Sequence, residues 1–320
     1  MDTIFPDVIG QLRAKRLLDF YVEGYKSTKV MPHLMFVAPK GCGKTLLGRS
    51  VAKTLKSIDD AKVYFEPNCS TIKNIKQFFN QMLIPYCQDR DATILFDEAS
   101  EIPRDVSMAL LTILNPNAEN RTSFTFDDYT IDFDFSRLTF MFATTETQSV
   151  FHALMDRLER VDLEEYSLDE MGQIVQLHLK AKIEPDTLRE IASVLRGNAR
   201  DGMKMASKIT NLCSQRKINT FGAKEWASLK HTLGIVPLGL NPSEIQVLRV
   251  LGNSKDCSLT NIAAKTGISK HAVQRDFEIY LQKHSLMEIT TAGRNITAKG
   301  LDYLKLLDGN DYSSPSEINA

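Results

Sequence analysis

The feature that most constrains the fold is a glycine-rich segment between a short apolar run and a helical pattern. Residues 38–45 read APKGCGKT, which fits the phosphate-binding P-loop with alanine at the first glycine position. Small residues let backbone N–H groups wrap phosphate oxygens at a helix N-terminus, so we expect Gly41 and Gly43 to line the loop. Lys44 would reach the β- and γ-phosphates, and the Thr45 hydroxyl would bind Mg²⁺. The segment therefore predicts a site for ATP and Mg²⁺.

A second apolar run, which ends in two carboxylates, supplies the other half of such a site. Residues 93–96 (TILF) read as a buried strand, and Asp97 and Glu98 follow it. Asp97 would hold Mg²⁺, and Glu98 would polarise the attacking water. Alone, this pattern is often a strand that ends in solvent, but its position after a P-loop favours the catalytic interpretation.

Short apolar runs alternate with helical patterns through the first part of the chain. Residues 34–37, 62–65, 93–96 and 138–142 read as strands, and 45–55 reads as a helix. Buried runs separated by helices predict an α/β fold with a parallel sheet and βαβ crossovers.

Two further patterns lie near the end of this region. The strand at 138–142 runs into Ala143-Thr144-Thr145, where a hydroxyl could bond the γ-phosphate or the water. Residues 122–135 alternate aromatic or β-branched with polar residues around Asp127-Asp128, which predicts a β-hairpin.

The remainder of the chain reads as helical, with a winged helix at its end. A capping-box pattern, Ser167 to Glu170, opens a helical stretch, and Pro and Gly residues in 236–242 mark a linker. Helices at 244–251, 259–265 and 270–284 followed by two short strands predict a helix-turn-helix variant with a hairpin. The expected parts are a nucleotide-binding domain (1–162), a helical lid (163–235), a winged helix (236–307) and a disordered polar tail (308–320).

Composition limits the class of protein. Lys and Arg number 39 against 40 Asp and Glu, a formal charge of −1, so any contact with nucleic acid must depend on a local patch. The five cysteines form no CxxC pair, which favours a reducing, cytosol-like compartment over a disulfide framework or zinc site. We see no signal peptide and no apolar run long enough to span a membrane.

The ordered series of motifs resembles the AAA+ ATPases and, within them, the RuvB family of Holliday-junction branch-migration motors. Ile9-Gly10-Gln11 resembles that family's adenine-side motif. FMFATTE resembles its sensor 1, with Thr145 at the sensor position, and LMDRLERVDLEEYSL resembles the arginine-finger segment, with Arg157 at the finger position. LRGNARDGMKMASKI resembles the sensor 2 helix, with Arg200 at the sensor position. The resemblance covers residues 5–307.

The chain departs from the family pattern at a few positions. Met155 stands where the family usually has another arginine, and Ala199 stands where sensor 2 usually has proline. Ala38 and Cys42 replace the usual Gly and Leu of the P-loop. The hairpin at 122–135, which in RuvB docks the junction-binding partner RuvA, is short and acidic at its turn. The sequence thus indicates a divergent relative from a bacterium or a phage, with a reduced case for a RuvA-type partner.

The resemblance implies an ATPase that works as a homo-oligomeric ring, a hexamer in this family, on branched or duplex DNA in a bacterial cytoplasm or a phage-infected cell. Two alternatives stay open at this point. A clamp-loader subunit has the same ATPase parts, although it ends in a helical collar that residues 243–307 do not resemble. An origin-binding initiator would use ATP as a slow assembly switch.

The expected DNA contacts lie in the winged helix. Residues 236–307 hold nine Lys and Arg against six Asp and Glu. Lys270 and Arg275 fall on the expected recognition helix and Arg294 falls on the wing, where they could contact phosphates. The alternatives are a solvated helix face or a protein-docking module.

Overall fold

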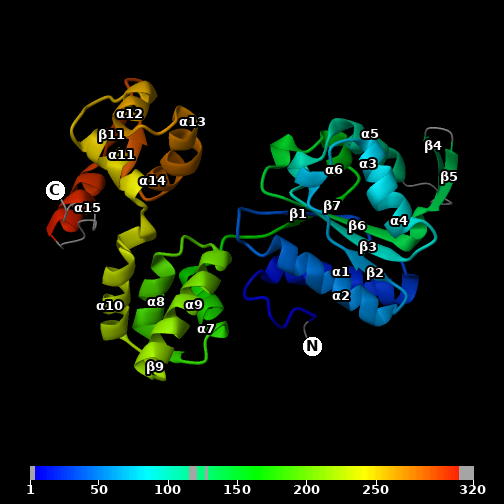
Figure 1. The fold of residues 1–320 in the computed structure, drawn as a ribbon, viewed down its shortest axis with the longest axis horizontal. Coiled ribbons are helices and arrows are strands. Elements are labelled where there is room, and N and C mark those ends of the chain that lie inside the picture. Colours follow the sequence, from blue (N-terminus) through cyan, green and yellow to red (C-terminus); the bar gives the residue numbers. More distant parts are fainter. Residues whose placement is uncertain (1–3, 115–120, 127–128, 310–320) are drawn as a thin grey trace. The chain divides into compact units, whose positions relative to one another are not determined.

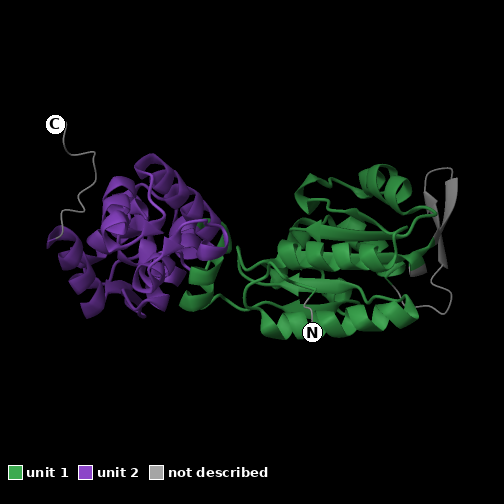
Figure 2. Ribbon diagram, turned by 90° about the horizontal axis from the view of Figure 1, so that it is seen from below, with its two compact units in different colours: residues 1–174, 197–201 green, residues 175–196, 202–320 purple. Residues whose placement is uncertain are grey.

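A computed structural model describes residues 4–114, 121–126 and 129–309 (Figure 1). The chain forms two compact units (Figure 2): one holds residues 1–174 and 197–201, and the other holds 175–196 and 202–320.

The first unit is built on a five-stranded parallel sheet with the strand order β2-β3-β6-β1-β7. Four of these strands were predicted, and they are confirmed. The fifth, β7, was missed because its sequence ERVD is mostly charged; it lies at the sheet edge and buries only Val161. The strands are β1 (Leu34–Val37), β2 (Val63–Phe65), β3 (Ala92–Asp97), β6 (Leu138–Thr144) and β7 (Glu159–Asp162).

Helices cover both faces of this sheet (Figure 1). Along β3, Leu95 packs into a core with α1 and α2, whereas Ile94 and Phe96 pack into a second core with α3 to α6. This alternation is what a strand buried on both faces requires. The helices are α1 (Leu12–Thr28), α2 (Lys44–Ile58), α3 (Ile75–Phe78), α4 (Ile84–Cys87), α5 (Arg104–Ile113) and α6 (His152–Met155), with a π-helical segment, η2 (Phe79–Leu83), joining α3 to α4.

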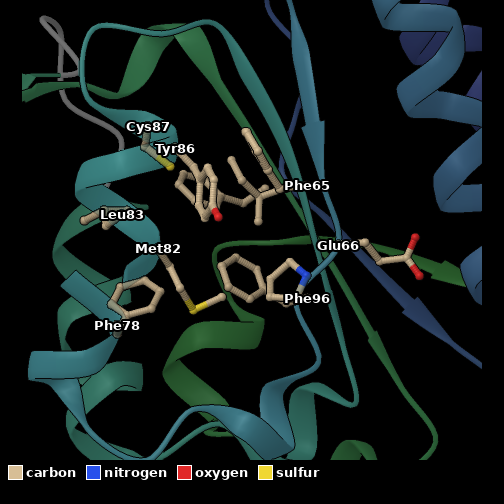
Figure 3. Close-up of a pocket in the computed structure, with 11 residues that line it drawn as sticks. Phe65, Glu66, Phe78, Met82, Leu83, Tyr86, Cys87 and Phe96 are labelled. Carbon is tan, nitrogen blue, oxygen red and sulfur yellow. The ribbon is translucent and has the colours of Figure 1, made fainter. Parts of the chain in front are cut away.

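The core under α3 and α4 contains a cavity of about 270 Å³ (Figure 3). Aromatic and sulfur-containing side chains line it, including Phe96 from β3 and Cys87 from α4, and burial raises the pKa of the Cys87 thiol to about 12. The Glu66 carboxylate at its rim points away from it and pairs with Arg49 of α2, with 2.6 Å between Oε1 and Nη2. The cavity is therefore apolar and has no charged group directed into it.

The predicted hairpin is confirmed. Strands β4 (Arg121–Phe126) and β5 (Tyr129–Asp134) pair antiparallel, with Phe126 opposite Tyr129. The acidic turn residues, Asp127 and Asp128, lie outside the described residues.

The boundary between the two units falls within the expected lid, because its residues up to Ile174 and residues 197–201 belong to the first unit and the rest belongs to the second. The Ser167–Glu170 capping box is present at the start of α7: the Ser167 N–H donates to Glu170 Oε2 at 2.8 Å, and the Glu170 N–H donates to Ser167 Oγ at 3.2 Å. The elements are α7 (Leu168–Leu177), β8 (Lys182–Ile183), α8 (Pro185–Ser193), α9 (Ala199–Arg216), β9 (Thr220–Phe221) and α10 (Ala223–Leu233).

The predicted winged helix is also present, and one helix was missed. After a short 3-10 turn, η6 (Pro237–Gly239), come α11 (Pro242–Gly252), α12 (Leu259–Thr266), α13 (Lys270–Ala272), the π-helical η7 (Val273–Glu278), α14 (Ile279–Lys283), β10 (Met287–Ile289), β11 (Arg294–Ile296) and α15 (Ala298–Gly309). The predicted start of the tail at residue 308 is therefore wrong, because Asp308 lies in α15 and pairs with Arg249 at 3.0 Å. The rest of that tail, 310–320, lies outside the described residues. Within the described part of the chain, no helix is long and apolar enough to cross a membrane.

His33, which precedes β1, makes the stability of the first unit depend on pH. Its Nδ1 accepts a hydrogen bond from the Phe140 N–H at 3.1 Å, and burial together with the nearby charge of Lys62 lowers the pKa of the imidazole to about 4. The unfolded chain therefore takes up a proton between about pH 6.5 and 4 that the folded chain does not. Folding stability must fall as the pH falls through this window.

We expect this single group to remove about 3 kcal/mol of unfolding free energy between pH 7 and 4. The measurement is urea unfolding across this range for the wild-type protein and His33→Asn, whose side-chain oxygen can accept the same N–H but cannot titrate. The wild type should lose more stability than the variant as the pH falls. Parallel curves would show that His33 does not resist protonation.

Candidate functional site

The P-loop lies between β1 and α2, as predicted. Gly41 and Gly43 have φ values of +84° and +93°, a region that L side chains rarely adopt. A Cβ at Gly41 would also lie 2.0 Å from Asn198 Oδ1, so both conformation and space require glycine there. Lys44 begins α2 and is 9% exposed, and its Nζ donates to Ala38 O at 2.8 Å. The loop thus presents N–H groups and one buried cation at a helix N-terminus.

The Mg²⁺ residues predicted from two distant motifs meet in the structure. Thr45 Oγ1 donates to Asp97 Oδ2 at 3.2 Å. A hydroxyl and a carboxylate are hard oxygen ligands that suit Mg²⁺, which takes its remaining ligands from phosphate and water. In keeping with so sparse a protein contribution, the described residues contain no group of three or more His, Cys, Asp or Glu side chains placed to hold a metal. The pair fits the ion that the sequence implied.

Glu98 is exposed directly after Asp97, and its backbone is in the left-handed region with φ of +58°. Its N–H donates to Asp97 Oδ1 at 3.0 Å, and the Asp97 N–H donates to Pro67 O at 3.0 Å. Non-glycine residues held at positive φ often mark functional sites. The exposed Glu98 is therefore the residue directly after the Thr45–Asp97 pair, at the start of a turn that its own N–H helps to fix.

Thr145 follows the last residue of β6 and is exposed, whereas Thr144 is buried. The Thr144 hydroxyl accepts the Glu146 N–H at 3.0 Å, which fixes the turn. Because β6 lies between β1 and β3 in a parallel sheet, Thr145 shares its edge with the P-loop and Asp97. The structure thus places the P-loop, Asp97-Glu98 and Thr145 at the same edge of the sheet.

The N-terminal motif reaches the P-loop through Gln11, for which the sequence predicted no individual role. Gln11 is buried, and its side chain donates to Glu164 O at 2.8 Å and accepts the Glu164 N–H at 2.9 Å. Its Nε2 also lies 3.5 Å from Cys42 O in the P-loop. Ile9 and Gly10 precede it, and a cavity of about 350 Å³ adjoins it. This cavity is lined by Gln11, Leu12, Arg13, Arg16, Glu164 and Glu170.

A second unpredicted contact comes from Tyr166, whose hydroxyl donates to Cys42 O at 3.2 Å. Burial raises the pKa of Tyr166 to about 12, so the phenol stays protonated. Cys42 is itself 1% exposed, so its side chain fills space inside the P-loop.

Arg200 also lies at the P-loop, as the sensor position implied. The Ala199 N–H donates to Gly41 O at 3.1 Å, and the Arg200 N–H donates to Asn198 Oδ1 at 3.0 Å. The Arg200 side chain is exposed. Burial lowers the pKa of Lys44, and the positive charge of Arg200 contributes to that shift. The site therefore holds two cations near one another, an arrangement that suits a polyphosphate.

Arg157 is placed differently, at the other end of the sheet. It precedes β7, whereas the P-loop follows β1, and the two strands are parallel neighbours. Along the strand direction, Arg157 is therefore separated from the P-loop of its own subunit by the length of four strand residues, about 13 Å. Its Nη1 donates to Ala153 O at 2.7 Å, and its buried Nε has no hydrogen-bond partner among the described residues. Arg160, its nearest competitor, is exposed and paired with Asp162 at 2.8 Å.

The three expected DNA residues fall into two groups. Lys270 and Arg275 are exposed on the continuous helix formed by α13, η7 and α14, and Arg275 lies beside Asp276 at 3.2 Å. Arg294 does not lie on an exposed wing. Its guanidinium pairs with Glu278 at 2.6 Å, and the two side chains are 15% and 5% exposed. The expectation for Arg294 is therefore corrected to a structural ion pair that joins β11 to the recognition helix.

Comparisons with known proteins agree with this arrangement. The model of the ATPase family associated with various cellular activities (AAA) matches residues 34–166, and the model of the RuvB C-terminal winged helix domain matches 237–305. The Holliday junction branch migration complex subunit RuvB of Campylobacter hominis is 24% identical, covering 94% of this chain and 89% of its own. The same subunit of Wolbachia is 26% identical, covering 94% and 92%. The fold is that of the Thermotoga maritima RuvB branch migration motor, with a TM-score of 0.74 at 19% identity, covering 95% and 99%.

Proposed function

We propose, from the premise that this chain belongs to the RuvB family of AAA ATPases, that it is an ATP-hydrolysing motor that drives branch migration of Holliday junctions. The observation that carries the proposal is the contact between Thr45 Oγ1 and Asp97 Oδ2 at the sheet edge that also holds Thr145. The match of residues 237–305 to a winged helix disfavours a clamp-loader subunit, which would end in a helical collar.

Each residue of the site has a distinct part in hydrolysis. Backbone N–H groups at Gly41 and Gly43 cradle the phosphates while Lys44 neutralises their charge. Thr45 and Asp97 would hold Mg²⁺, which would supply neutralisation of the phosphate charge.

The remaining side chains act on the γ-phosphate and the water. Glu98 accepts hydrogen bonds from the attacking water and orients it, Thr145 donates to the γ-phosphate or the water, and Arg200 stabilises the charge that develops. Ile9 is proposed to lie on the adenine side, because it comes two residues before Gln11, whose Nε2 lies 3.5 Å from Cys42 O in the P-loop.

Arg157 completes the site of a neighbouring subunit. Its place at the opposite end of the sheet supports action in trans, because its own γ-phosphate position lies beyond the far end of β1. A site that needs such an arginine is complete only in a ring, and we propose a homo-hexamer. The hairpin formed by β4 and β5 is proposed as the docking element for a junction-binding partner of the RuvA type, and the bacterial cytoplasm is the proposed location.

The test of the proposed function uses a synthetic four-way DNA junction labelled with a fluorescence pair across two arms. The full-length protein should separate the arms in an ATP-dependent reaction, and its ATPase should be stimulated by DNA of any sequence. Slow turnover with a sequence-specific footprint would instead identify an initiator.

Lys270 and Arg275 are proposed to contact DNA phosphates. Replacing both by alanine should weaken DNA binding about equally for all sequences and reduce the salt dependence by about one unit of slope for each phosphate that is no longer neutralised. The measurement is the Kd for a labelled duplex at several salt concentrations. ATPase without DNA should stay near the wild-type rate.

The matched control is Lys305→Ala, which removes an exposed cation of the same domain that lies on α15 and not on the recognition helix. It should leave the salt slope nearly unchanged. If the double variant also keeps the wild-type slope, the DNA surface lies elsewhere.

A further inference from the structure

Arg196 lies at the point where the chain passes from one unit to the other. The second unit includes residues up to Arg196, residues 197–201 belong to the nucleotide-binding unit, and the chain returns at Gly202. Arg196 has a φ of +56° and Gly197 has a φ of +69°. A left-handed conformation is unfavourable for a non-glycine residue, so side-chain contacts must hold Arg196 in place.

The Arg196 guanidinium is held by the linker and by α11. Its Nε and Nη2 donate to Gly239 O at 3.1 and 2.8 Å, and its Nη1 donates to Glu244 Oε1 at 2.9 Å, with Nη2 paired to Glu244 Oε2. The Glu244 side chain is fully buried and also accepts the Asn241 N–H at 2.8 Å. One cation thus binds the turn before α11 and the first turn of α11 itself.

The same guanidinium also contacts the recognition helix. It lies over the Tyr280 ring, 3.9 Å from the ring centroid, and the Tyr280 hydroxyl donates to Leu238 O at 2.8 Å. Tyr280 belongs to α14, which continues the helix that carries Lys270 and Arg275. Lysine could not make this set of contacts, because only a planar guanidinium forms a fork to a carboxylate while stacking on an aromatic face.

We propose that Arg196 is a positioning residue that couples nucleotide at the sensor 2 turn to DNA at the winged helix. Arg200, on that turn, is four residues further along the chain and lies at the P-loop, so a displacement of the turn on ATP binding acts directly on Arg196. Because Arg196 is bonded to the linker, to α11 and to the recognition helix, such a displacement reaches the DNA-binding side chains. The inference rests on the proposed function, and it adds the residue through which nucleotide binding and DNA binding influence one another.

The measured quantity is a coupling ratio: the Kd of the full-length protein for a labelled four-way junction with ADP, divided by the Kd with a slowly hydrolysed ATP analogue. Coupling between sites is typically 5–150-fold. In Arg196→Lys we expect the ratio to fall to near one and DNA stimulation of the ATPase to disappear. ATPase without DNA should stay close to the wild-type rate. A residue that only stabilised the fold would lower the melting temperature and leave the ratio unchanged.

Two further variants keep the outcome decisive. Arg249→Lys changes an exposed arginine of the same unit, paired with Asp308 at 3.0 Å, and should keep the wild-type ratio. Tyr280→Leu removes the stacking partner while leaving the Arg196–Glu244 pair, and should lower the ratio even if Arg196→Lys fails to fold. A folded Arg196→Lys or Tyr280→Leu protein with the wild-type ratio would overturn the role of Arg196 and leave the proposed function unaffected. A wild-type protein without DNA-stimulated ATPase would overturn the proposed function first.

Discussion

Replacing Glu98 by glutamine should reduce ATP turnover by about 10²–10⁴-fold while ATP still binds. The amide keeps the size of the side chain but cannot accept a proton from the attacking water. The residues proposed to bind phosphate and Mg²⁺, Lys44, Thr45 and Asp97, are untouched, so nucleotide affinity should be preserved. The measurements are steady-state phosphate release and the Kd of a fluorescent ATP analogue.

Two comparisons isolate this effect. Glu101→Gln alters an exposed carboxylate three residues away in the following 3-10 turn, η3 (Ala99–Glu101), and should leave turnover almost unchanged. Lys44→Ala should instead weaken nucleotide binding itself, because it removes the buried cation of the loop. Turnover of Glu98→Gln near the wild-type rate would place the water-orienting group elsewhere.

The second large effect is expected at Arg157. An arginine that reaches a neighbour's γ-phosphate can contribute 10³–10⁵ in rate, so Arg157→Ala should be almost inactive as an ATPase. Mixing this protein with the equally inactive Lys44→Ala should restore part of the activity. In a ring that exchanges subunits, some interfaces then pair an intact P-loop with an intact Arg157.

The control for Arg157 is Arg160→Ala, because that guanidinium is exposed and bound to Asp162 within its own strand. It should keep most of the ATPase activity. Subunit exchange must be followed separately with a labelled subunit. If labelled subunits exchange and the mixture stays inactive, Arg157 does not act in trans.

The placement of the residues proposed to bind phosphate and Mg²⁺ could be predicted because each motif is contiguous in sequence and follows a recognisable apolar strand. The parallel order of β1, β3 and β6 then places the motif ends at one edge of the sheet without further information. Their meeting, seen in the Thr45–Asp97 contact, follows from topology alone.

Contacts between distant, ordinary-looking residues could not be predicted in this way. Gln11 binds Glu164, and Tyr166 binds Cys42, across 153 and 124 residues of sequence. Arg294 was expected to contact DNA because a sequence shows which residues are charged but not which of them pair. In the structure its guanidinium forms an ion pair with Glu278. Strand β7 was missed for a related reason: an edge strand needs only one buried side chain.

The discontinuity of the nucleotide-binding unit has a consequence for synthesis of the protein. Residues 1–174 hold the sheet, the P-loop and Glu98, but residues 197–201 complete the unit and bond to Gly41. During translation residues 197–201 leave the ribosome well after the last strand of the sheet, and because domains generally fold as units, the nucleotide-binding unit can be completed only then. A nascent chain that ends before Gly197 has the proposed catalytic residue Glu98 but lacks Arg200, the proposed sensor arginine. Truncation after the last strand of the sheet, however well it folds, would yield a protein without part of its nucleotide site.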